Sequence, residues 1–131
     1  MSHINARVSA IESEGIIHIV SFQAGTNLLK MMSLELPRHI KIDTEVKLQV
    51  KATSVALAKN LSGTFSYSNQ ISSQVKSIEQ GKLLSSLILT KEELRLESII
   101  TTASLKRLSL SIGDNVTALI KSSDLSIAEV L

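Results

Sequence analysis

The sequence carries one pattern twice, and this repeat limits what the chain can fold into. In residues 115–128, alternating apolar residues lead to Lys121, two serines follow, and a second apolar segment leaves the corner. Residues 45–58 have the same order around Lys51. Apolar residues at every second position are typical of β-strands. Each copy therefore predicts a strand, a lysine, a tight corner of small residues and another strand.

Further equivalent residues extend this repeat to the whole chain of 131 residues. Val8 recurs as Val75, 67 positions later, and Ile42 recurs as Ile112, 70 positions later. The change of separation from 67 to 70 places a net insertion of three residues in the middle of the second copy.

Each copy has about five short strands in roughly 65 residues, which is the content of a small OB-like barrel. We therefore predict an all-β fold with short helical turns, made of two tandem OB-like five-stranded Greek-key barrels. The domains are expected at 1–61 and 62–131. Helical turns are expected at 33–40 and 102–108, the second with Thr101 or Thr102 as its N-cap.

Composition and motifs exclude several classes of protein. With 44% hydrophobic and 20% charged residues the chain is globular, and the absence of cysteine removes thiolate metal sites and disulfides. The N-terminus does not resemble a signal peptide and no apolar run reaches membrane-spanning length, so we expect a cytoplasmic protein without a membrane partner. His3, His18 and His39 lack the spacing of metal ligands, and no catalytic motif is present. The chain is therefore predicted not to be an enzyme.

The second copy resembles a known family in several stretches. Residues 100–108 (ITTASLKRL) and 112–124 (IGDNVTALIKSSD) carry the resemblance, together with SYSNQ at 66–70 and SIEQG at 77–81. In these residues the chain resembles the Mop/TOBE domain of molbindins and molybdate-responsive regulators. That resemblance implies a tandem di-Mop protein that binds molybdate or tungstate between subunits of a homo-oligomer, with no organic cofactor.

The resemblance also implies which residues bind the oxyanion. They are Thr101, Ser104, Lys121 and Ser122 of the second copy, with Ser66 and Ser68 in the opening motif. Ser68 stands where the family usually has arginine. The first copy keeps only the corner Lys51, Ala52 and Thr53. Its counterpart of the Thr101/Ser104 pair falls around 31–34, and neither of the two possible alignments there restores the pair of hydroxyls.

These residue types suit a tetrahedral dianion. Molybdate has four acceptor oxygens and no proton at neutral pH, so a site made only of donors satisfies it. Small residues at Ser122 and Ser123, and at Ala52 and Thr53, would let the anion approach backbone N–H groups. Plainer interpretations stay open: a solvated lysine at a strand end, Thr101 as a simple N-cap, and Ser66 and Ser68 as linker serines.

The predicted function is storage, homeostasis or sensing of molybdate or tungstate, with a protein partner in the case of a sensor. Small barrels favour oligomers. Stand-alone di-Mop proteins of the family are trimers and the regulator-attached ones are dimers, so the resemblance implies a trimer, with a dimer as the alternative. The alternative is an OB-fold module that binds nucleic acid or protein. Nucleic-acid binding is disfavoured because only Phe22, Phe65 and Tyr67 are aromatic and the net charge is +2.

Overall fold

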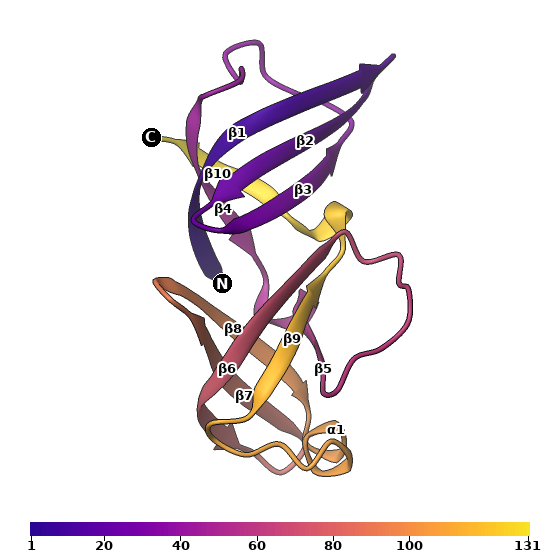
Figure 1. The fold of residues 1–131 in the computed structure, drawn as a ribbon, viewed down its shortest axis with the longest axis vertical. Coiled ribbons are helices and arrows are strands. Elements are labelled where there is room, and N and C mark those ends of the chain that lie inside the picture. Colours follow the sequence, from indigo (N-terminus) through magenta and orange to yellow (C-terminus); the bar gives the residue numbers. More distant parts are fainter.

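The computed structural model describes residues 1–131 and contains ten strands in two five-stranded antiparallel sheets (Figure 1). The prediction of an all-β fold with two five-stranded units is confirmed. The strands are β1 (Ser2–Glu14), β2 (Ile17–Ala24), β3 (Asn27–Ser33), β4 (Glu45–Val50), β5 (Ala56–Ala58), β6 (Asn69–Gln80), β7 (Leu84–Lys91), β8 (Leu94–Thr101), β9 (Asn115–Ile120) and β10 (Ser126–Val130). The helices are α1 (Thr102–Arg107) and the 3-10 turns η1 (Ala52–Ser54) and η2 (Ser122–Asp124). None of these helices has the length and apolar character needed to cross a bilayer.

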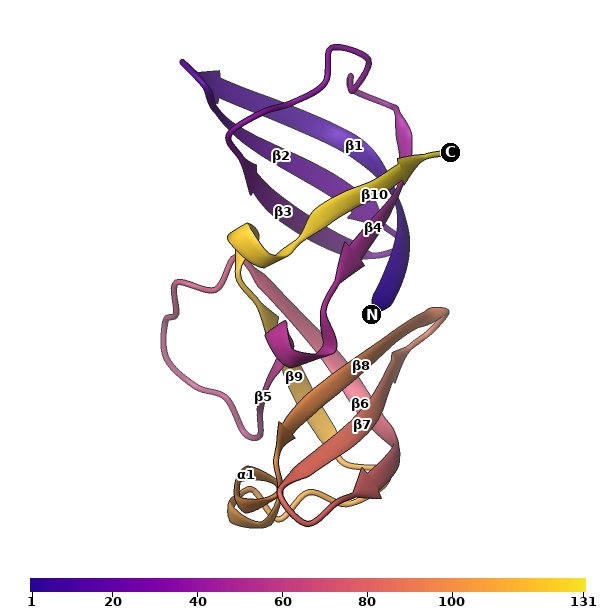
Figure 2. The same cartoon turned by 180° about the vertical axis from the view of Figure 1, so that it is seen from behind.

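The two halves exchange their last strands. The first sheet has the order β10-β4-β1-β2-β3, and the second has the order β5-β9-β6-β7-β8. The C-terminal strand β10 therefore completes the sheet of the first half, while β5 completes the sheet of the second half (Figures 1 and 2). The division into domains 1–61 and 62–131 stays a prediction that describes the sequence repeat, since each sheet contains strands from both ranges.

Strand registers agree with the repeat found in the sequence. Ser2 lies opposite Val50 in the first sheet, and Asn69 lies opposite Ile120 in the second. These pairs are related by the separations of 67 and 70 residues seen in the sequence. Both long first strands also shift register at equivalent places, after Val8 and after Val75.

Helix α1 lies in the segment of the second half that carries the three-residue insertion. In the second half Thr101 is the N-cap of α1 and accepts a hydrogen bond from Ser104 N–H, as predicted. At 33–40, where a short helix or helical turn is expected, the structure has no helix, and the one turn there is closed by a hydrogen bond from Ile40 N–H to Pro37 O. Pro37 lacks an N–H donor, and the segment is three residues shorter than its counterpart.

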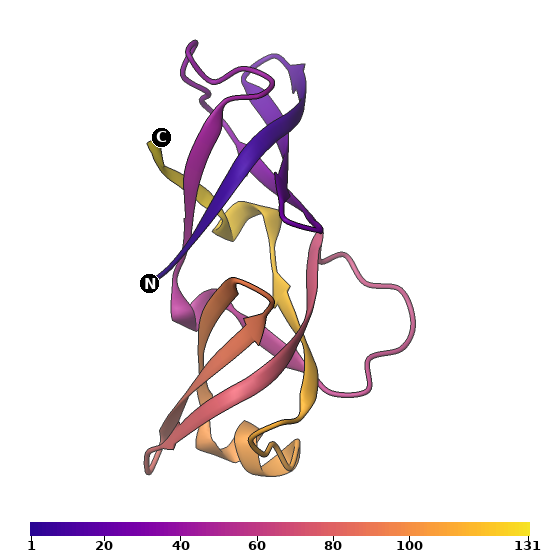
Figure 3. The ribbon, with the colours of Figure 1, turned by 60° about the vertical axis from the view of Figure 1, so that its left-hand side comes forward.

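One hydrophobic core runs through both halves. Its 24 buried residues come from strands of both sheets. Val55 and Leu125, which directly follow the two 3-10 turns, are 1% and 2% exposed. Each exchanged strand is thus anchored by a buried side chain at the point where the chain crosses over. By contrast, the segment between β5 and β6 stands away from both sheets as a wide loop (Figure 3).

Asn69 fastens the second half to the edge of the first sheet. Its side chain is fully buried and forms two hydrogen bonds with the main chain of Lys30 in the edge strand β3. Lys30 N–H donates to Asn69 Oδ1 at 2.7 Å, and Asn69 Nδ2 donates to Lys30 O at 2.9 Å. At the equivalent place Ser2 makes one bond, in which Glu97 N–H donates to Ser2 Oγ at 2.8 Å.

Replacing Asn69 by alanine should destabilise the protein more than replacing Ser2. Asn69→Ala leaves a buried N–H and a buried carbonyl without partners, so we expect a loss of about 2–3 kcal/mol in the free energy of unfolding. Ser2→Ala removes one bond and should cost about 1 kcal/mol. Urea denaturation of the two variants measures both values. Equal losses would contradict the assigned role of Asn69.

Candidate functional site

The two lysine corners are the points at which the chain crosses from one sheet to the other. Lys51 links β4 to η1 and β5, and Lys121 links β9 to η2 and β10. Their backbone angles are nearly identical, with φ −71° and ψ 140° at Lys51 and φ −66° and ψ 146° at Lys121. Each lysine carbonyl accepts a bond from the N–H three residues later, at Ser54 and Asp124. The first N–H groups of such a turn have no partner within it.

Both corners lie at the junction of the two halves. Ala56 is opposite Leu119 and Ser126 is opposite Gln49, which brings the two crossing segments together near the middle of the molecule (Figure 2). In addition, η1 packs against β8 and η2 packs against β3. The Lys51 corner of the first half therefore contacts β8, an edge strand from the second half. The Lys121 corner of the second half contacts β3, an edge strand from the first half.

The corner residues are accessible and small. Lys51, Lys121, Thr53 and Ser123 are exposed, Ser122 is half-buried, and Ala52 is buried. Neither lysine takes part in an ion pair. The arrangement presents an ammonium group, hydroxyls and backbone N–H groups on an open surface, a donor set that can contact an anion without first breaking a salt bridge.

The opening serines are placed differently from one another. Ser68 is exposed and directly precedes Asn69, which lies opposite Ile120, so Ser68 is close to the Lys121 corner. Ser66 is exposed in the loop between β5 and β6. At the Lys51 corner Met1 takes the place of Ser68, and Ser2, which lies opposite Val50, takes the place of Asn69. Ser2 was not identified from the sequence, although the separation of 67 residues from Asn69 points to it.

Thr101 and Ser104 lie at the other end of the second sheet. Thr101 lies opposite Leu84, the first residue of β7. Lys121 directly follows Ile120, which lies opposite Asn69, the first residue of β6. The 12 residues of β6 span on the order of 30 Å between these places. Figure 1 shows the same separation, with α1 at the lower end and β10 leaving near the junction. A single chain therefore does not bring the Thr101/Ser104 pair to Lys121.

Thr101 and Ser104 form a small hydrogen-bonded group with Arg107. Ser104 N–H donates to Thr101 Oγ1 at 3.1 Å, the Thr101 hydroxyl donates to Ser104 Oγ at 2.9 Å, and Arg107 Nη2 donates to Ser104 Oγ at 3.0 Å. The capping interpretation of Thr101 is thus correct. Arg107 places an exposed cation beside the two hydroxyls, a residue not singled out from the sequence.

In the first half the same position is apolar. The pairing of His18 with Ser33 is equivalent to the pairing of Ser85 with Ile100, each residue being displaced by 67 positions. Leu34 therefore takes the place of Thr101, and its side chain is 62% exposed. This register confirms that the first half lacks the hydroxyl pair.

A hollow of about 530 Å³ between the halves is separate from the corners. It is lined by polar side chains that include His3, Asn27, Lys91 and Arg95. Lys91 Nζ donates to Asn27 Oδ1 at 2.7 Å across it. Neither Lys51 nor Lys121 lines this hollow, so the predicted binding residues lie on the surface rather than in it.

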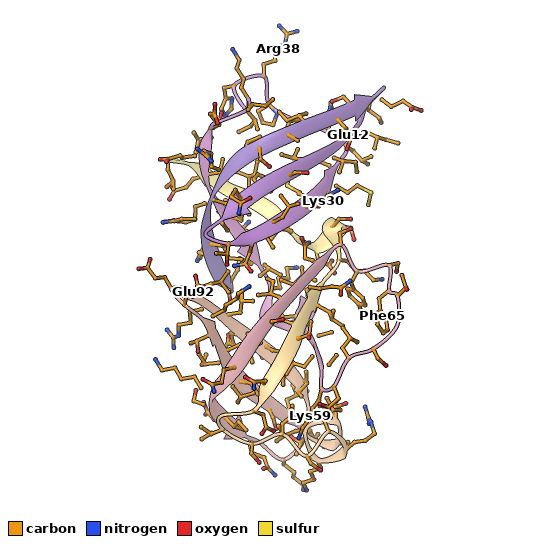
Figure 4. The ribbon with its side chains drawn as sticks, viewed as in Figure 1. Glu12, Lys30, Arg38, Lys59, Phe65 and Glu92 are labelled. Carbon is orange, nitrogen blue, oxygen red and sulfur yellow. The ribbon has the colours of Figure 1, made fainter.

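Lys59 and Asp114 hold the end of α1. Lys59 Nζ donates to Leu108 O and Ser109 O at 3.3 and 3.0 Å and pairs with Asp114 Oδ2 at 3.2 Å (Figure 4). Ser111 N–H also donates to Asp114 Oδ2, at 2.9 Å. The hydrogen bond from Ser111, followed by that from Lys59, lowers the pKa of Asp114 below its ordinary value of 3.8.

Comparison with known proteins places the second half of the chain in a family. Residues 66–127 match the TOBE domain. The second half of the chain is a TOBE domain. No curated protein sequence matches the chain.

Two solved structures resemble this TOBE protein. The first is the cytoplasmic molybdate-binding protein ModG in a form with molybdate bound, at 27% identity and a TM-score of 0.90, covering 95% of this chain and 93% of the other. The second is a molybdate-binding protein from Sporomusa ovata, at 32% identity and a TM-score of 0.45, covering 46% of this chain and 90% of the other. The tandem Mop-like architecture agrees with ModG, and because ModG is a binding protein, the prediction that the chain is not an enzyme is borne out.

The bonds of Asp114 should make stability depend on pH in a defined direction. Because the folded pKa of Asp114 is lowered, its contribution is present above the ordinary value of 3.8 and is lost as pH falls through the folded pKa. The wild type should therefore have a higher melting temperature than Asp114→Asn at neutral pH, and this difference should shrink below pH 3.8. Thermal melts from pH 7 to pH 2 measure it. A difference independent of pH would contradict this role of Asp114.

Proposed function

We propose that the chain binds molybdate or tungstate in the cytoplasm, without catalysis, for storage, homeostasis or sensing. The observation that carries the proposal is the pair of lysine corners, both exposed, free of carboxylate partners and placed at the junction of the halves. The likeness to molybdate-bound ModG over nearly the whole chain supports the choice of ligand.

The corner offers the donors that a tetrahedral dianion needs. Lys121 supplies the charge, Ser122 and Ser123 supply hydroxyls, and the start of η2 supplies backbone N–H groups. Lys51, Ala52 and Thr53 offer a similar set with one hydroxyl fewer. Ser68 lies close enough to Lys121 to complete the second corner, and we include Ser66 as a loop residue that would have to fold inward.

The remote position of Thr101 and Ser104 supports assembly into a homo-oligomer. Within one chain they lie at the far end of β6 from Lys121. We propose that they meet an oxyanion together with residues of a second copy, in a trimer or alternatively a dimer. In a sensor, the same anion would change the affinity for a partner protein.

Molybdate should raise the melting temperature of the protein in a concentration-dependent way. A ligand that binds only the folded form stabilises it by RT ln(1 + [L]/Kd), about 2.7 kcal/mol at a hundredfold excess over Kd. Lys121→Ala should remove most of this shift and Lys51→Ala a smaller part. Thermal melts with molybdate, tungstate and sulfate measure it.

Lys76→Ala is the matched control, because Lys76 is an exposed lysine on β6 without an ion pair. It should keep the full shift. The proposal fails if the wild type shows no shift at millimolar molybdate or tungstate. A shift that survives both corner substitutions would move the site away from the corners.

A further inference from the structure

The two corners differ in the residue that the other half presents to them. The edge strand at the Lys121 corner is β3, and the edge strand at the Lys51 corner is β8. Lys30 in β3 and Glu97 in β8 are equivalent residues of the repeat, since they are 67 positions apart. Both residues are half-buried, and both are held through their main chain by the first residue of a long strand, Asn69 or Ser2.

Lys30 is fixed close to Lys121. Asn69 binds the main chain of Lys30 on one side and lies opposite Ile120, the neighbour of Lys121, on the other. Spacings between neighbouring strands put the Cα atoms of the two lysines on the order of 10 Å apart, within reach of an anion between their side chains. The ammonium group of Lys30 takes part in no ion pair and in no hydrogen bond (Figure 4).

The net charge therefore differs between the two corners. At the Lys121 corner, Lys30 adds a second cation, which offsets the carboxylate of Asp124 in η2. At the Lys51 corner, Glu97 adds a carboxylate, whose Oε2 accepts a hydrogen bond from Ser86 at 2.9 Å. A dianion is attracted by the first arrangement more strongly than by the second, where Glu97 cancels the charge of Lys51.

We propose that Lys30 is an oxyanion-binding residue of the Lys121 corner and that Glu97 weakens anion binding at the Lys51 corner. This inference rests on the proposed function and adds a residue from the opposite half of the chain to the site. Lys30 supplies the positive charge that is missing at Ser68. The binding corner is then a composite of both halves, and the corners are unequal in affinity.

Calorimetric titration of the full-length protein with molybdate and with tungstate tests this inference. Lys30→Gln should weaken binding by about tenfold, the effect of one unit charge on a dianion some 6 Å away in water. Lys30→Arg should restore most of the affinity, because it restores the charge. The melting temperature of ligand-free Lys30→Gln should stay near that of the wild type, since Asn69 binds only the main chain of Lys30.

Lys76→Gln is the control for the loss of a positive charge elsewhere on the surface and should bind as the wild type does. If the wild type binds the oxyanion and Lys30→Gln binds as well as Lys76→Gln, the role of Lys30 is overturned while the proposed function stands. If the wild type binds neither oxyanion, the proposed function itself fails.

Glu97→Gln gives the reciprocal test. Removing this carboxylate should strengthen binding that depends on Lys51, so the Glu97→Gln protein should bind more oxyanion per chain than the wild type at the same free concentration. The gain should disappear in the double variant with Lys51→Ala. Unchanged binding in Glu97→Gln would overturn the assigned role of Glu97.

Discussion

The exchange of the last strands is the constraint on which the rest of the structure depends. Each sheet is completed by a strand from the other half, so neither half can form its five-stranded sheet alone. The buried amide of Asn69 reinforces the exchange by forming hydrogen bonds with the N–H and carbonyl of Lys30, which have no partner strand at the edge of the sheet. Unpaired edges invite association with other chains, and here the protein covers part of each edge with its own residues.

The same exchange determines where the lysine corners lie. A chain that leaves one sheet and enters the other has to turn at the boundary, and η1 and η2 are these turns. The buried Val55 and Leu125 anchor the chain immediately afterwards, which leaves the lysines on the surface. Anion-binding groups placed at such turns are therefore surrounded by residues of both halves, and a substitution in one half can change the electrostatics of a site in the other.

Much of this architecture could be predicted from local sequence patterns. The alternation of apolar and polar residues predicted the strands, and the internal repeat predicted the two units. Thr101 was predicted as the N-cap of α1 because threonine is a favoured capping residue. Strand exchange could not be predicted. The strands β5 and β10 have only three and five residues, and the alternation of apolar residues in so short a strand does not specify which of the two sheets it joins. The break in alternation at 33–40, together with Pro37, excludes a strand and suggests a helical turn, but this shorter segment forms no helix.

Most of the predicted site residues lie on the surface, but which of them lie together depends on the tertiary structure. Thr101 and Lys121 belong to one sequence motif yet lie at opposite ends of β6, whereas Lys30, which belongs to no motif, lies by the Lys121 corner. Duplication alone would make two equal sites. At equivalent places, Leu34 stands for Thr101 and Glu97 stands for Lys30, so one half lacks the hydroxyl pair and one corner has a carboxylate in place of an ammonium group. The two corners of the duplicated fold therefore have the same backbone geometry but different charged side chains around them. The affinity of each corner for an anion depends on these charges and not on the backbone geometry alone.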